Sequence, residues 1–236
     1  MCIRDSYITR WRLEPRDTAA YLRGELTKPV TPIRFYIGGA VPEHLRPYII
    51  KGILDWNQAF ERAGFKNAIQ AIVPHDTLDV DGDDMRYSVL TYAASEKANA
   101  MGPSTIDPRT GEILEADIIW WHNVQSLISE WIVVQTGAVD PRARSLELPL
   151  ELIGDAVRFV ACHEVGHSLG LRHNMMASAA YPTDSLRSAS FTSRMGGTSA
   201  SIMDYARFNY VAQPGDGVKV MSPNIGPYDL MAIEWG

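Results

Sequence analysis

Hydrophobic and polar positions along the chain follow two periods, which predict a mixture of strands and helices. Residues 32–37 alternate β-branched and aromatic side chains and predict a strand, as do residues 67–73, 85–93 and 113–121. Apolar residues at helical spacing over residues 42–63 predict a helix, with Pro42 in its first turn and Gly64 after its end. This order of elements predicts an α/β fold.

Two further helices are predicted in the second half of the chain. Residues 122–138 have helical spacing, and Asp140 and Pro141 end that helix. Pro149 begins a longer helix that continues to residue 169, and its apolar positions require one side to face the core.

The end of this longer helix contains the most informative stretch, HEVGHSLGLRH over residues 163–173. On a helix, His163 and His167 project from one face about one turn apart and can share a metal ion. Glu164 lies about 100° further round, where it can lean toward a water molecule at an open coordination position. A continuing helix would carry His173 about 15 Å away, so the helix must end first. Gly170 accepts the left-handed conformation that ends helices and redirects the chain.

This spacing predicts a zinc site with His163, His167 and His173 as ligands and Glu164 as general base. The first two histidines alone would also be typical of a helix surface. The glycine and the third histidine at fixed offsets favour the metal site.

The motif HExxHxxGxxH resembles the zinc-binding signature of the metzincin metallopeptidases. Thirty residues after His173, the segment SIMDY over residues 201–205 resembles their Met-turn, in which Met203 would form an apolar floor beneath the zinc. Without the zinc motif, Met203 would be interpreted as an ordinary residue of the hydrophobic core. Tyr205 matches a tyrosine that astacin-like and serralysin-like members place near the zinc, where it ligates the metal or stabilises the oxyanion. A buried ring beside the site is the alternative for Tyr205.

Five blocks of the chain are similar to the catalytic region of large exported bacterial zinc-dependent metalloproteases: residues 161–167, 174–180, 181–186, 201–213 and 225–236. The resemblance covers residues 7–236. The resemblance implies a metzincin-like catalytic domain with a small mixed twisted sheet, a long active-site helix, a Met-turn and a C-terminal helix. It also implies export to the periplasm, the cell surface or the medium.

The function implied is that of a zinc-dependent endopeptidase, in which Glu164 assists the attack of a zinc-bound water on a peptide bond. Residues 113–121 would form the edge strand above the cleft and pair with an extended protein or peptide substrate. A plain core strand is the alternative for this segment. Two other functions stay open, an inactive zinc-bearing binding module and a zinc hydrolase of a non-peptide bond.

Length, charge and hydrophobicity bear on the number of domains and on whether the protein binds nucleic acid or spans a membrane. A chain of 236 residues with 46% hydrophobic content can bury the core of one or two domains, and we expect one. The net charge of −6 without a basic stripe argues against a nucleic-acid partner. The sequence contains no apolar run near the roughly 18 residues that a transmembrane helix needs.

The first six residues, MCIRDS, match what a transposon mosaic-end adapter used in sequencing libraries would encode if translated. We therefore expect residues 1–6 to be an artefact and residues 7–236 to form one catalytic domain, a fragment of a longer protein. On this expectation, the true N-terminus and any signal peptide are missing.

An acidic loop over residues 76–84 could bind calcium through Asp79, Asp81 and Asp83. Its glycine stands at loop position four instead of six, and Leu90 stands where an EF-hand has glutamate. These departures favour a solvated loop.

The remaining histidines and the second cysteine are predicted to have no part in the metal site. The three motif histidines already fill the protein-donated positions of a catalytic zinc, so His122 is expected to be structural. His44 and His75 are expected at the surface, and Cys162 is expected to be a small buried core residue.

Overall fold

The computed structural model describes residues 8–75 and 80–236 and has a mixed sheet at its centre. The sheet has the order β2-β1-β3-β7-β4, in which β4 is antiparallel to β7 and the other pairs are parallel. The strands are β1 (Ile33–Ile37), β2 (Ile69–Ile72), β3 (Ser88–Ala93), β4 (Ala100–Met101) and β7 (Ile118–Trp121). This architecture confirms the predicted α/β fold.

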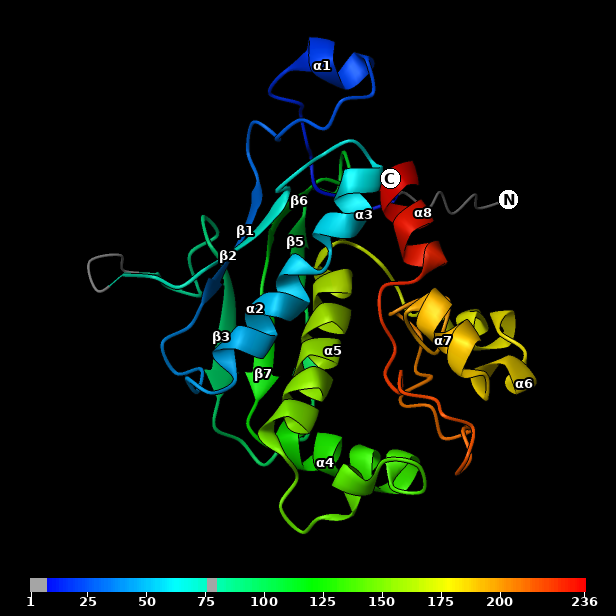
Figure 1. The fold of residues 1–236 in the computed structure, drawn as a ribbon. Coiled ribbons are helices and arrows are strands. Elements are labelled where there is room, and N and C mark those ends of the chain that lie inside the picture. Colours follow the sequence, from blue (N-terminus) through cyan, green and yellow to red (C-terminus); the bar gives the residue numbers. More distant parts are fainter. Residues whose placement is uncertain (1–7, 76–79) are drawn as a thin grey trace, which may run out of the picture.

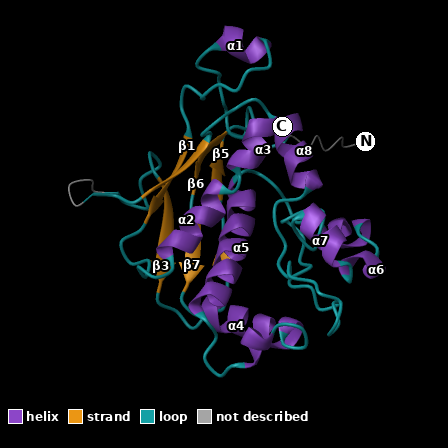
Figure 2. Ribbon diagram, in the orientation of Figure 1, coloured by secondary structure: helices purple, strands orange, loops and turns teal. Residues whose placement is uncertain are grey.

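Helices α2 (Arg46–Leu54) and α5 (Leu150–Ser168) lie side by side on one face of the sheet (Figure 2). Gly52 permits their close approach, because a Cβ atom there would lie 2.6 Å from the carbonyl oxygen of Arg158. The helices are α1 (Thr18–Leu22), α2 (Arg46–Leu54), α3 (Asn57–Arg62), α4 (Val124–Thr136), α5 (Leu150–Ser168), α6 (Thr183–Leu186), α7 (Ala189–Met195) and α8 (Pro227–Trp235), with 3₁₀ helices at Pro141–Arg144 and Met175–Ala180.

The helix predicted over residues 42–63 is divided into α2 and α3 at Asp55 and Trp56. Both residues are engaged with α5. The Trp56 ring is fully buried and its Nε1–H donates to the Cys162 carbonyl at 2.8 Å, while Asp55 forms an ion pair with Arg158. The break therefore allows both side chains to contact the long helix.

The strand predicted over residues 113–121 is two strands, and neither forms the edge of the main sheet. Residues Ile113–Ala116 form β6, which pairs with β5 (Ser104–Ile106) in a separate two-stranded sheet. Strand β7 lies inside the main sheet, between β3 and β4. Asp117 marks the break, because its N–H donates to the Pro103 carbonyl and its carboxylate accepts the N–H of Val89 at 2.8 Å. The prediction of an edge strand at 113–121 was wrong, and β4 holds that position.

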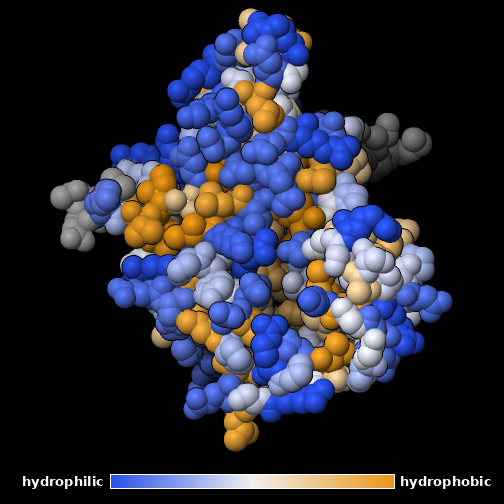
Figure 3. All heavy atoms as spheres, in the orientation of Figure 1, coloured by the Kyte–Doolittle hydropathy of each residue, from blue (hydrophilic) through white to orange (hydrophobic). Residues whose placement is uncertain are grey.

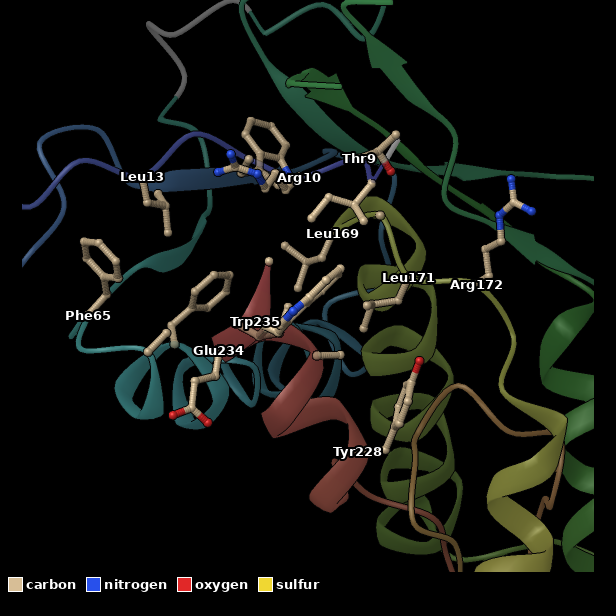
Figure 4. A pocket seen from close by; sticks show the side chains of 18 of the residues that line it. Thr9, Arg10, Leu13, Phe65, Leu169, Leu171, Arg172, Tyr228, Glu234 and Trp235 are labelled. Atoms are coloured by element: carbon tan, nitrogen blue, oxygen red, sulfur yellow. The ribbon is translucent and has the colours of Figure 1, made fainter. Parts of the chain in front are cut away.

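The last part of the chain, coloured yellow to red in Figure 1, is mostly loop with the short helices α6, α7 and α8. Helix α8 packs against α3. A cavity of about 710 Å³ lies between the N-terminal segment, α3, α8 and the turn after α5 (Figure 4). Its lining includes Leu169 and Arg172 but none of the three motif histidines.

The face of the molecule shown in Figure 3 is largely hydrophilic around α1 and has apolar patches nearer its middle. In the part of the chain that the structure describes, no helix has both the length and the apolar character needed to cross a membrane. The suspected artefact at residues 1–6 lies outside the described residues.

Candidate metal centre

The three motif histidines converge at the end of α5. One ring nitrogen from each of His163, His167 and His173 lies within 4.8 Å of the other two, and no other such group of three or more potential ligands occurs among residues 8–75 and 80–236. The Nε2 atoms of His167 and His173 are 3.0 Å apart. Two nitrogens bound to one tetrahedral zinc at about 2.0 Å lie roughly 3.3 Å apart, so this spacing fits a shared ion.

A Schellman motif ends α5 and returns His173 to the site. The N–H of Leu171 donates to the Gly166 carbonyl, and the N–H of Gly170 donates to the His167 carbonyl. Gly170 has a φ of +94°, and a Cβ atom there would lie 2.2 Å from the Thr9 carbonyl oxygen. Both the conformation and the close approach require glycine at this position.

Backbone carbonyls orient the first two imidazoles. The Nδ1–H of His163 donates to the Ile202 carbonyl at 2.8 Å, and that of His167 donates to the Leu171 carbonyl at 2.9 Å. These bonds leave each Nε2 lone pair free for a metal. Burial lowers the pKa of His163 to about 3 and also lowers the pKa values of the other two histidines. The neutral rings and their geometry fit zinc.

Glu164 lies on α5 beside the first ligand and is only 8% exposed. Burial raises the pKa of its carboxyl group to about 7. Next to β4, Gly102 packs against the same helical turn, since a Cβ atom there would lie 2.5 Å from the Glu164 carbonyl oxygen. The edge of the main sheet therefore lies directly beside the helical turn that carries Glu164.

The Tyr205 ring packs against two rings of the histidine cluster. Its centroid is 4.2 Å from that of His173 and 5.6 Å from that of His163, and the residue is 45% exposed. Burial is the first cause that raises the pKa of the Tyr205 phenol, followed by the charge of Glu164. The phenol therefore remains protonated at neutral pH and retains a hydrogen to donate. Because the Tyr205 ring is exposed, the alternative of a buried ring beside the site does not describe it.

Met203 lies beneath the helical turn that joins the first two ligands. It is fully buried, and a Cβ atom at Gly166 would lie 2.2 Å from its sulfur atom. Its carbonyl accepts the N–H of Asn174, the residue that follows His173. The turn at residues 201–205, called the Met203 turn below, thus contacts the segments on both sides of the histidine cluster.

A buried carboxylate that the sequence analysis did not identify holds this turn in place. Asp229, in the first turn of α8, accepts hydrogen bonds from the Ser201 hydroxyl at 2.6 Å, the Ile202 N–H at 2.7 Å and the Gly226 N–H at 2.8 Å. Because the Ile202 carbonyl in turn orients His163, Asp229 is connected to the metal centre through the backbone of the turn.

Replacing Gly166 with alanine is expected to distort the metal site. The new methyl group would overlap the Met203 sulfur, and crowding of this kind costs about 1–3 kcal/mol. We expect zinc affinity to fall roughly 10- to 100-fold, as for other groups that support ligands. Zinc titration against a chromogenic chelator measures this loss.

A control for this substitution is Gly39→Ala, because a Cβ atom there has no neighbour within 4 Å. The double variant Gly166→Ala/Met203→Ala, which removes the clashing sulfur, should recover part of the affinity. Wild-type affinity in Gly166→Ala would show that the turn does not support the metal site.

The other candidate residues are not part of the histidine cluster. The Nδ1 atom of His122 lies 2.7 Å from the Tyr92 hydroxyl, and His122 is not in the cluster of ligand atoms. His44 and His75 are exposed, and Cys162 is buried, as predicted. In the acidic loop, Asp79 lies outside the described residues, and the Asp81 carboxylate accepts the Asp83 N–H within a local turn.

The segment that carries the histidine site is similar to a known protein family. Residues 145–236, which contain α5, the Met203 turn and α8, match the model of a family described as Met-zincin. Comparison with curated proteins and with solved structures gave no match.

Proposed function

We propose that this protein is a zinc-dependent endopeptidase. The observation that carries the proposal is the convergence of three imidazoles next to a buried carboxylate on the same helix. Three histidine ligands are typical of catalytic zinc sites, which keep a further coordination position open. The Met-zincin match over residues 145–236 supports the same class of enzyme.

His163, His167 and His173 would hold the ion through Nε2 atoms, because backbone carbonyls occupy the Nδ1–H of the first two. Zinc, when bound, supplies the Lewis acidity that activates water and polarises a peptide carbonyl. Glu164 accepts the proton of the attacking water and delivers it to the leaving amine. A carboxyl group with a pKa of about 7 is suited to both transfers at neutral pH.

Tyr205 is proposed to stabilise the negative charge that develops on the carbonyl oxygen. Its ring contacts the His163 and His173 rings, and its phenol is protonated. Such a donor stabilises the transition state more than the substrate, because the charge appears only as the bond is attacked.

The substrate is proposed to bind in extended form beside β4. This strand pairs with β7 on one side and forms the edge of the main sheet on the other. Gly102, which follows it, contacts the turn of α5 that carries Glu164. Backbone hydrogen bonds to such an edge would place a peptide bond next to the histidines with little reading of its sequence.

A fluorogenic peptide library, assayed with and without a zinc chelator, tests this function. We expect cleavage that the chelator abolishes and that added zinc restores. Stoichiometric zinc without cleavage would instead favour the binding module, although that function gives Glu164 no role. Chelator-sensitive hydrolysis of esters but not of peptides would favour the non-peptide hydrolase.

Export to the periplasm, the cell surface or the medium is also part of the proposal, since it follows from the resemblance to exported metalloproteases. Fractionation of cells that express the natural gene tests it, because the proposal requires the protein outside the cytoplasm.

A further inference from the structure

Arg207 places a positive charge at the edge of the metal centre. It follows Met203 by four residues and has a φ of +58°, a conformation that is costly for a residue with a side chain. The carbon atom of its guanidinium group, Cζ, lies 3.8 Å from the centre of the Trp131 ring and 4.6 Å from that of Tyr205. The His173 imidazole packs against the same Tyr205 ring, with the two ring centroids 4.2 Å apart, so the guanidinium lies near the histidine cluster.

The guanidinium is partly buried but has no acidic partner among residues 8–75 and 80–236. Its nitrogen atoms make no hydrogen bond to these residues either. The fully buried polar atoms that lack a partner belong instead to Glu115, Trp120 and Tyr181, so the Arg207 nitrogens are not completely enclosed. By contrast, the partly buried Arg158 is paired with Asp55. A desolvated cation is costly unless it is paired, so the open donors of Arg207 suit an anionic group that arrives with a ligand.

Neighbouring segments hold Arg207 in place. The N–H of the next residue, Phe208, donates to the Gln135 side chain on α4 at 2.9 Å. Trp131, one turn earlier on α4, covers the guanidinium. Rings against a guanidinium leave its in-plane N–H groups free, and this fork matches a carboxylate in a two-bond geometry.

We propose that Arg207 binds a carboxylate of the substrate close to the scissile bond and makes the enzyme prefer peptides that are acidic at that point. This proposal rests on the endopeptidase function above and names its substrate class. The carboxylate is an Asp or Glu side chain next to the cleaved bond, or the free C-terminus of a short peptide. Successive Cα atoms of a peptide are about 3.8 Å apart. The side chain of a substrate residue next to the scissile bond can therefore extend from the histidines to the neighbouring Arg207.

Matched peptide pairs test the preference. One set replaces Glu by Gln at each position flanking the cleaved bond, and a second set compares a free C-terminus with its amide. For wild type, we expect kcat/KM to be on the order of 10- to 100-fold higher for the acidic member of one set, the range typical of a charged hydrogen bond. The set that shows the difference identifies the source of the carboxylate.

Variants of Arg207 connect this preference to the residue. In Arg207→Gln the acidic-to-neutral ratio should fall to near one, and Arg207→Lys, which keeps the charge without the planar fork, should retain part of it. Arg194→Gln removes an exposed arginine that also contacts an aromatic ring and should keep the wild-type ratio. A purely structural role would lower the rates of both peptides equally and leave the ratio unchanged.

A wild-type ratio near one in both sets, or an unchanged ratio in both Arg207 variants, would overturn the proposal. Cleavage of neutral peptides by the wild type would then leave the endopeptidase function standing. Absence of all zinc-dependent cleavage would instead mean that the endopeptidase function itself is wrong.

Discussion

Glu164→Gln is expected to lower kcat for peptide hydrolysis by about two to four orders of magnitude, the usual loss when a general base is removed. The amide has nearly the same size but cannot accept a proton from water. Because the three imidazoles come from other residues, the variant should retain zinc at wild-type stoichiometry. Steady-state kinetics together with metal analysis of the same preparation measure both quantities.

Glu151→Gln is the matched control, since it makes the same chemical change at an exposed position in the first turn of the same helix. Its kcat should equal that of the wild type. Peptide hydrolysis by Glu164→Gln within a factor of ten of the wild type would exclude the proposed role of Glu164. Loss of zinc along with activity would show that the side chain supports the site instead of transferring protons.

The convergence of the three histidines could be predicted because their arrangement is local in sequence. One turn of helix fixes the relation of His163 to His167, and Gly170 alone determines where the chain reverses before His173. No contact with a distant segment is needed to infer this geometry, and the structure brings the three rings together as the spacing indicates.

The edge of the sheet could not be predicted, because it depends on which strands pair. Residues 113–121 form an almost continuous apolar run, and only the hydrogen bonds of Asp117 to Pro103 and Val89 show where it divides. Strand β4 has two residues, too few to produce a period in the sequence. The pairing of distant segments, and not local propensity, decides which strand lies next to the helical turn that carries Glu164.

The role of Asp229 could not be predicted from the sequence for a similar reason. An acidic residue in the first turn of a helix is usually explained by the helix dipole alone. Nothing in its neighbourhood along the chain indicates that it is fully buried or that its carboxylate binds Ser201 and Ile202. This arrangement becomes visible only when α8 is placed against the Met203 turn.

Asp229→Ala is expected to destabilise the protein by about 3 kcal/mol or more, because it leaves three donors in the buried site without their acceptor. Urea unfolding in the presence of a chelator measures this cost without the contribution of metal binding. The freed turn would also orient the Ile202 carbonyl, and therefore His163, less firmly. We expect zinc affinity of the folded variant to fall roughly 10- to 100-fold.

Glu234→Ala provides the comparison on the same helix, since Glu234 forms only an exposed ion pair with Arg62. Such pairs contribute about 0–1 kcal/mol, so unfolding and zinc binding should stay near the wild-type values. Should Asp229→Ala fail to fold, Asp229→Asn keeps the shape and one acceptor oxygen, and its loss of stability should be smaller but measurable. An Asp229→Ala protein that unfolds within about 1 kcal/mol of the wild type and binds zinc equally well would mean that the Asp229 carboxylate is not required to position the Met203 turn. The backbone hydrogen bond between Asn174 and Met203 and that of the Met203 N–H to the Ser201 hydroxyl would then suffice to hold it.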